Sequence, residues 1–201
     1  MNIDQQTPRE LLQQFYIDNN LGLDGGQKSS SVRIELTPKF NFYFPNFDAR
    51  REAVIKHDIH HLLTGYDTTI IGESEISTWE IASGCKKYWA AFLIDTSGVM
   101  VGLPFSFSRV LKAFARGRRT KNLYHDIFSN ETALDMKISE LREILNLNHN
   151  PQNTSPNLTD VILFTLFIFY GVIYSILLLV TLPILLLYSI YIGISNPKLE
   201  L

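Results

Sequence analysis

The order of apolar and polar residues divides the chain into a mixed body and an apolar tail. Residues 1–160 hold 17 of the 18 lysines and arginines and 19 of the 20 aspartates and glutamates, whereas residues 161–194 are 34 residues without Lys, Arg, Asp, Glu or His. Within the body, residues typical of helix starts and helix ends separate several helical segments. The sequence therefore predicts a mainly α-helical fold, with a single helical domain over residues 1–147, a linker over 148–160 and a membrane segment over 161–194.

The first helix is marked by the TPRE sequence at residues 7–10, which supplies a hydroxyl cap, a proline at the first helical position and a glutamate three residues after the cap. We expect this helix to run to about Asp18. Residues 32–44 (VRIELTPKFNFYF) alternate only in part, and Pro38 and Pro45 interrupt the pattern. This segment is therefore expected to be irregular, or an edge strand at most.

Five further helical stretches are expected in the body. Asp48 can cap a helix that runs to about Thr64, with Gly65 as its stop. A second runs from residue 67 or 68 to residue 83, although Gly72 is unusual inside a helix. Later stretches lie at residues 85–93, 106–116 and 135–147.

The apolar tail is expected to enter a membrane. As one helix, its 34 residues would measure about 51 Å, against a hydrocarbon core of about 30 Å. Pro183 can kink or break it. Two arrangements follow: a transmembrane span over residues 161–182 with a short kinked piece after it, or a re-entrant hairpin. The N-terminus lacks a signal-peptide pattern, so the body of this membrane-anchored chain is expected to face the cytoplasm.

Composition narrows the function classes. The body is close to neutral, with a net charge of −2, because it holds 17 cations and 19 anions. This balance argues against nucleic acid as a partner, which would favour a basic domain. The single cysteine, Cys85, excludes an internal disulfide framework and a multi-cysteine zinc site.

The candidate chemistry lies in the sequence KHDIHHLLTGYDTTIIGE at residues 56–73. His57 and His61 are four residues apart, which places both imidazoles on one helix face, where they can close on a divalent metal. Asp58 borders that face, and a helix pair joined at Gly65 would return Glu73 toward the histidines. Two histidines with one or two carboxylates leave coordination positions open; the set suits zinc and also matches the two-histidine, one-carboxylate pattern of non-haem iron. His60 is expected to point elsewhere.

Two other motifs compete with this interpretation. H-D-x-x-H is similar to the zinc-protease motif H-E-x-x-H, with a shorter acid in place of the glutamate. His125-Asp126 forms a second His-Asp doublet, as in some phosphohydrolases, without a full series of ligands.

The full pattern, H-D-x-x-H followed after eleven residues by Glu and then by Trp79-Glu80, resembles the coenzyme Q biosynthesis protein four family. The segments IIGE, AFARGRRTKNL and SELREILNL extend the resemblance over roughly residues 48–147. The resemblance places the metal ligands at His57, Asp58, His61 and Glu73. The N-terminal region is only loosely similar, and the long apolar tail is not typical of that family.

The resemblance implies a role in ubiquinone biosynthesis, namely oxidative decarboxylation of a polyprenylated aromatic head-group precursor. The cofactor would be a divalent metal, with zinc expected first and iron or manganese as alternatives, and Asp58 or Glu73 would carry out proton transfer. The alternative is a non-catalytic lipid-binding scaffold that organises quinone-biosynthesis enzymes. Expected partners are the prenyl lipid, the membrane and such enzymes; a homodimer is compatible with this interpretation.

A basic cluster follows in the body. Six cations lie within thirteen residues: Arg109, Lys112, Arg116, Arg118, Arg119 and Lys121. They could contact anionic lipid headgroups or a substrate carboxylate, or form a solvated helix face.

Overall fold

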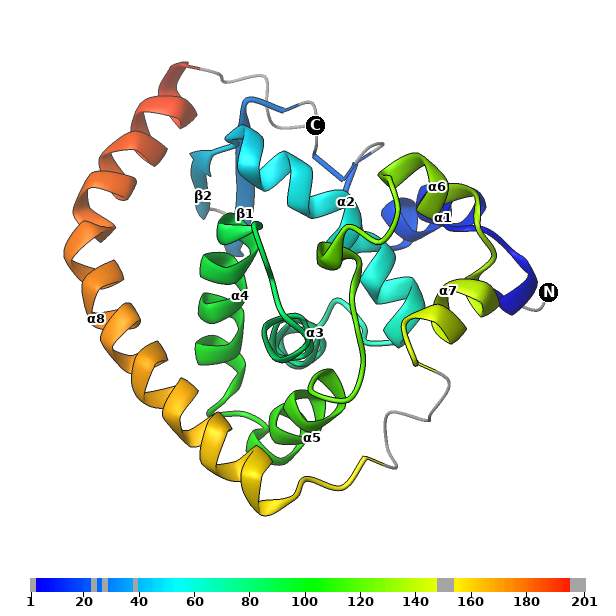
Figure 1. The fold of residues 1–201 in the computed structure, drawn as a ribbon. Coiled ribbons are helices and arrows are strands. Elements are labelled where there is room, and N and C mark those ends of the chain that lie inside the picture. The colour runs from blue at the N-terminus through cyan, green and yellow to red at the C-terminus, as the bar shows by residue number, and fades with distance from the viewer. Residues whose placement is uncertain (1–2, 23–24, 27–28, 38–39, 148–153, 196–201) are drawn as a thin grey trace.

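The computed structural model describes the chain except for residues 1–2, 23–24, 27–28, 38–39, 148–153 and 196–201. Helices surround a central helix, a β-hairpin lies at one end, and a long C-terminal helix curves along one side (Figure 1). The elements in chain order are η1 (Ile3–Gln5), α1 (Pro8–Asp18), β1 (Ser31–Thr37), β2 (Phe40–Pro45), α2 (Asp48–Thr64), α3 (Ile70–Ser83), α4 (Trp89–Gly102), α5 (Phe107–Gly117), η2 (Leu123–His125), α6 (Asn130–Asp135), α7 (Ile138–Ile144) and α8 (Leu158–Ser195). The mainly helical fold with an apolar C-terminal segment is confirmed.

The N-terminal helix α1 has the predicted bounds and cap. The side chain of Thr7 accepts a hydrogen bond from the backbone N–H of Glu10, and the carboxylate of Glu10 accepts one from the backbone N–H of Thr7. This reciprocal pair satisfies two donors that a helix start leaves without a partner. The helix then packs on α2 through Leu12 and Tyr16, which are buried in the main core.

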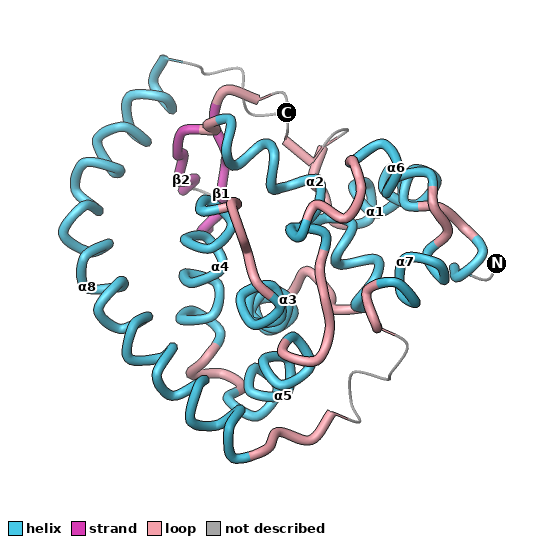
Figure 2. The backbone as a smooth tube through the Cα atoms, viewed as in Figure 1, coloured by secondary structure: helices cyan, strands magenta, loops and turns pink. Residues whose placement is uncertain are grey.

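The segment expected to be irregular, or an edge strand at most, forms the two paired strands of an antiparallel hairpin. Strands β1 and β2 pair in a register that runs from Ser31 opposite Pro45 to Thr37 opposite Phe40, with one irregularity between Glu35 and Thr37. Among the described residues this hairpin is the whole sheet (Figure 2). Pro45 is tolerated because it is the last residue of β2. Pro38 lies outside the described residues.

Helix α2 ends as expected, with Gly65 in the left-handed conformation at φ 77°. Helix α3 starts two to three residues later than predicted, because the side chain of Thr69 caps it by accepting from the backbone N–H of Gly72. A Cβ at Gly72 would lie 2.0 Å from Oδ1 of Asp67. The unusual interior glycine is therefore explained by the close approach of the preceding turn.

Helix α3 lies at the centre of the body, between α4 and α5 (Figure 1). It is buried nearly all round, although several of its residues are small and polar. Small side chains allow close helix crossings: a Cβ at Gly98 of α4 would lie 2.5 Å from Oγ of Ser77. The hydroxyls of Thr78 and Ser83 donate to backbone carbonyls four residues earlier, so their burial leaves no hydroxyl donor unpaired.

Two helix predictions were wrong. The helix expected at residues 85–93 begins at Trp89 and continues to Gly102. The polar residues Asp95 and Thr96 do not end it: both are buried, and the hydroxyl of Thr96 donates to the carbonyl of Phe92. Lys86, with φ 49°, lies in the turn before it. The helix expected at residues 135–147 is two short helices, α6 and α7, separated by extended backbone at residues 136–137.

The tail forms one continuous helix, α8, that includes Pro183. It is long and apolar enough to cross a membrane. Its inner side contacts α4, α5 and β2, and Phe164 packs into a small core with Val99, Val110 and Phe114. Neither a break at Pro183 nor a hairpin is present in α8.

Candidate metal centre

Helices α2 and α3 bring three predicted ligand residues together. The Nε2 atoms of His57 and His61 lie 3.2 Å apart. The carboxylate of Glu73 faces both, with one oxygen 3.5 Å from Nε2 of His57 and the other 3.4 Å from Nε2 of His61. The i,i+4 spacing on α2 and the turn at Gly65 produce this arrangement, as the sequence suggested.

The second nitrogen of each imidazole has a partner elsewhere. Nδ1 of His61 lies 2.9 Å from the carbonyl oxygen of Tyr66, to which it donates. Nδ1 of His57 lies 3.0 Å from the carboxylate of Glu80. With these tautomers, both Nε2 atoms present lone pairs toward each other and toward the carboxylate of Glu73. Such an arrangement is repulsive unless a proton or a metal cation lies between them.

The separations also match the geometry of a metal site. Ligand atoms at 2.0–2.1 Å from a tetrahedral zinc are about 3.3–3.4 Å apart. Here the two nitrogens are 3.2 Å apart, and each lies 3.4–3.5 Å from a different oxygen of Glu73, so the carboxylate offers one oxygen to each histidine. The residues present therefore fit a divalent cation. The site is open on one side, because the side chain of Glu73 is 40% exposed, which leaves room for water or a substrate group.

Neighbouring charged groups set the protonation states of the ligand residues, and these states favour a cation at the centre. Burial raises the pKa of Glu73, but hydrogen bonds and charge from His57 and His61 outweigh it and lower that pKa to about 2. Burial lowers the pKa of His57, but the neighbouring carboxylates of Glu80 and Glu73 raise it well above its usual range. In the metal-free protein, a proton on His57 thus takes the place of a cation.

Asp58 does not join the three clustered ligand atoms in the described structure. It is buried, and its Oδ2 accepts a hydrogen bond from the hydroxyl of Tyr16 on α1 at 2.9 Å. Burial raises the pKa of its carboxyl. Asp58 follows His57 directly in the chain and therefore lies near the centre. Direct ligation by Asp58 stays a prediction.

Glu80 was not predicted as part of the site, although its carboxylate contacts one of the ligand histidines. This carboxylate is fully buried and lies 2.5 Å from Nδ1 of His60 as well as 3.0 Å from Nδ1 of His57. Asp95 of α4 lies nearby, and burial together with the charge of Glu80 holds its pKa well above its usual range. One signal was available: Glu80 follows Glu73 by seven residues, which places both on one face of α3.

His60 points away from the centre, as expected. Its Nδ1 faces Glu80, and its Nε2 accepts the backbone N–H of Leu123 at 2.9 Å. Its ring packs edge-on against Trp79 and Tyr124. His60 is therefore a core histidine whose two ring nitrogens are both used.

The basic cluster is largely engaged inside the protein. Arg109 pairs with Glu75 of α3. Arg116 is 4% exposed, donates to the carbonyl of Thr64 at 3.0 Å and lies over the ring of Tyr66. The guanidinium of Arg116 thus closes the end of α2 and does not face a headgroup.

Arg118 and Arg119 both pair with the buried carboxylate of Asp160, at 2.5 and 2.7 Å. They tie α5 to the start of α8. Lys112 and Lys121 are exposed, as are Arg109, Arg118 and Arg119 beside their ion pairs, and contact with lipid headgroups stays a prediction for these five.

The competing His-Asp doublet has a structural use. Nε2 of His125 lies 2.7 Å from the carbonyl oxygen of Ser83, and Asp126 pairs with Lys56 and Lys87. No metal-ligand group contains either residue among the described part of the chain.

The chain matches no protein-family model, no curated protein and no solved structure. The resemblance to the coenzyme Q biosynthesis protein four family therefore rests on the motif at residues 57–80 and its flanking segments.

Proposed function

We propose that the chain holds one divalent metal ion between His57, His61 and Glu73. The observation that supports this most directly is the convergence of two imidazole lone pairs and a carboxylate at separations of 3.2–3.5 Å, with both Nδ1 atoms already bound elsewhere. Zinc is the first candidate, because imidazole nitrogens and a carboxylate oxygen are ligands that suit zinc. Bound there, the metal would act as a Lewis acid.

The substrate class follows from the resemblance and from the apolar tail. We infer a polyprenylated aromatic acid in the membrane, from which the ring carboxylate is removed oxidatively during ubiquinone biosynthesis. Glu73, on the open side of the centre, would orient the head group. Proton transfer would fall to Asp58, or to Glu73 where it is not engaged as a ligand. The alternative is a scaffold that uses the same centre to recognise a lipid headgroup without turnover.

The metal is tested by elemental analysis of full-length protein purified in detergent. Ala at His57, His61 or Glu73 should remove most of the bound metal. His125→Gln is the matched control, because this histidine is outside the centre, and it should keep its metal. Full occupancy in the His57→Ala, His61→Ala double variant would end the assignment.

Enzyme and scaffold are separated by turnover. Metal-loaded protein, incubated with a prenylated hydroxybenzoic acid and molecular oxygen, should replace the ring carboxylate by a hydroxyl group, with release of carbon dioxide and reduction of oxygen to hydrogen peroxide, and the Glu73→Ala variant should not. Retention of the lipid without release of carbon dioxide would favour the scaffold.

A further inference from the structure

The apolar helix α8 is attached to the body at three points along its length. At its start, Asp160 binds Arg118 and Arg119. In the middle, Gly171 lies so close to Met100 of α4 that a Cβ would be 2.4 Å from its sulfur. The inner side of α8 is therefore shaped to fit the body.

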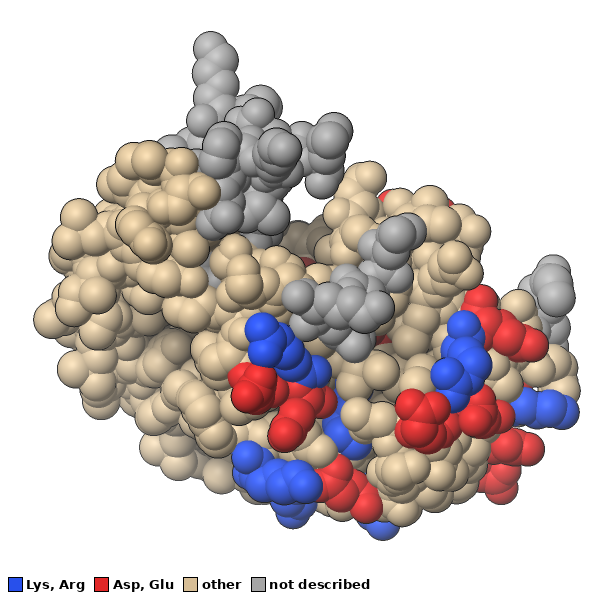
Figure 3. All heavy atoms as spheres, turned by 90° about the horizontal axis from the view of Figure 1, so that it is seen from above, with Lys and Arg blue, Asp and Glu red and all other residues tan. Residues whose placement is uncertain are grey.

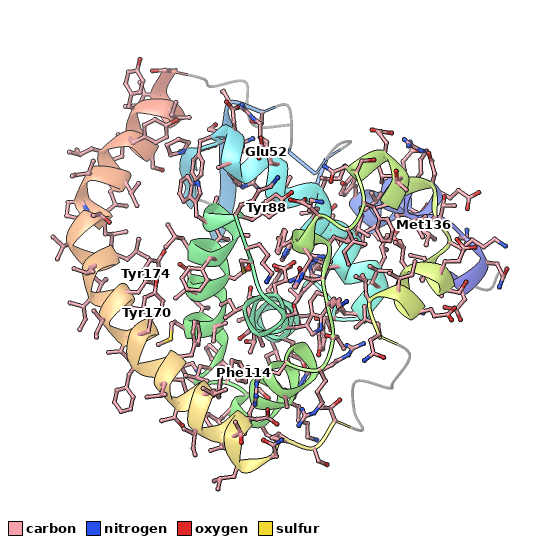
Figure 4. All side chains as sticks on the ribbon, viewed as in Figure 1. Glu52, Tyr88, Phe114, Met136, Tyr170 and Tyr174 are labelled. Atoms are coloured by element: carbon pink, nitrogen blue, oxygen red, sulfur yellow. The ribbon has the colours of Figure 1, made fainter. Side chains whose placement is uncertain are left out.

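Two further polar contacts hold the middle and the end of α8. The hydroxyls of Tyr174 and Ser97 lie 3.3 Å apart, and Tyr174 points from α8 toward α4 (Figure 4). Near the C-terminal end, the hydroxyl of Ser189 accepts the backbone N–H of Tyr43 at 2.8 Å. This contact covers an edge donor of strand β2.

The outer side of α8 is an almost entirely apolar surface, and the hydroxyls of its exposed Thr165 and Thr181 donate to backbone carbonyls of the helix itself. Of the 32 large apolar residues that are exposed among the described residues, 20 belong to α8. Phe105 and Phe107, beside the start of α8, extend this surface and are 68% and 50% exposed. On the face seen in Figure 3, acidic and basic side chains gather on the side away from α8. Monomers rarely leave so large an apolar surface in water.

The length of α8 disagrees with a simple transmembrane span. Its 38 residues correspond to about 57 Å, nearly twice the thickness of the hydrocarbon core of about 30 Å. Even its uncharged run of 34 residues, about 51 Å long, would need to tilt by about 54° to lie within that core, beyond the usual range of 0–40°. Spanning would also pull Gly171 and Ser189 away from the body, because the body cannot follow them into the lipid.

We propose that α8 lies along the surface of a lipid bilayer. Its outer side sits among the acyl chains, its inner side stays on the body, and both ends remain on the same side of the membrane. The occupant is lipid and not a protein, because the tail offers 34 residues without a charged side chain or a histidine, whereas even the cores of protein interfaces are only about 65% apolar. An interfacial helix normally exposes a polar face to water; here the folded body covers that side of α8 instead.

A two-stage labelling experiment tests the topology in the full-length chain. Ser155 and Ser195 flank most of α8 and are exposed; both become cysteine in a Cys85→Ala background. Protein in vesicles of phosphatidylcholine and phosphatidylglycerol receives a membrane-impermeant maleimide first, then a second maleimide after detergent is added. Mass spectrometry counts the labels on each molecule, so the orientation of the protein in the vesicles does not matter.

Each molecule should carry two copies of the same label. One copy of each label on the same molecule would mean that α8 spans the bilayer and would overturn the proposal. Protein that fails to float with the vesicles would overturn it as well, in favour of a protein partner for the apolar surface.

Depth measurements exclude a re-entrant hairpin, which also leaves both ends on one side. Leu166, Leu177 and Ile184 are exposed and fall within about 20° of one another around the helix, at 3.6 residues per turn. A fluorophore on a cysteine at each position, quenched by brominated lipids, should report depths that agree within a few ångströms. A progressive change of depth, or one position much deeper than its neighbours, would refute the surface arrangement.

Discussion

Glu80→Gln tests whether the buried carboxylate orients the metal-binding histidine. Glu80 is fully buried and faces the Nδ1 atoms of His57 and His60 at 3.0 and 2.5 Å. The substitution keeps the size of the side chain but offers one carbonyl oxygen to two imidazole N–H donors. The NH₂ group of the glutamine is itself a donor and would face the second imidazole N–H. One of the two histidines must then lose its partner or rotate.

The expected cost has two parts. A hydrogen bond to a charged group contributes about 1.5–3 kcal/mol, and a buried donor left without a partner costs about 1–3 kcal/mol. We therefore expect the metal-free protein to lose roughly 2.5–6 kcal/mol of unfolding free energy. Metal affinity should fall about 10–100-fold, because a carboxylate that binds the far nitrogen of a ligand histidine fixes the ring and raises its basicity.

Chelator competition measures the metal affinity, and denaturant titration with and without metal measures the stability. The matched control is Glu75→Gln, the same change on the same helix. Glu75 is buried, but it pairs with Arg109, whose side chain is 51% exposed and can be hydrated, so this variant should lose less, about 1–2 kcal/mol, and keep its metal affinity. A folded Glu80→Gln protein whose metal affinity stays within twofold of the parent would refute the orienting role, as would equal effects in the two variants.

Three further predictions follow from the same contacts. Burial lowers the pKa of His57, but the charges of Glu80 and Glu73 raise it by more, so the net shift is upward. Metal affinity should therefore weaken as pH falls through that raised pKa, whereas the stabilisation that protonated His57 gives the metal-free protein should be lost as pH rises through it. Calorimetric metal titrations across pH test this prediction. Arg116→Met should cost about 2 kcal/mol of stability, since it removes the buried guanidinium from the end of α2, and should leave flotation with anionic vesicles unchanged; reduced flotation would restore a lipid role. Gly72→Ala should lower the melting temperature and cost about 1–3 kcal/mol, because the new Cβ would overlap the preceding turn; an unchanged melting curve would contradict the close approach.

The sequence alone determined the features that depend on neighbours along the chain. The TPRE cap placed the start of α1, and Gly65 placed the end of α2. The spacing of His57 and His61 predicted that both imidazoles would meet, because a helix turns by a fixed angle at every residue. The absence of charge over residues 161–194 likewise predicted a segment that avoids water, because this property depends on composition and not on contacts with other elements.

Only the tertiary structure decided which polar groups are paired inside the body. The sequence shows Glu80 and Arg116 as charges on helices, without indicating that the first lies between two imidazoles and the second closes α2. Likewise, the sequence does not indicate that Asp95 of α4 is buried close to Glu80 of α3. A buried charge is tolerated only where partners from other elements compensate its lost hydration, and those partners are brought together by folding, not by sequence spacing.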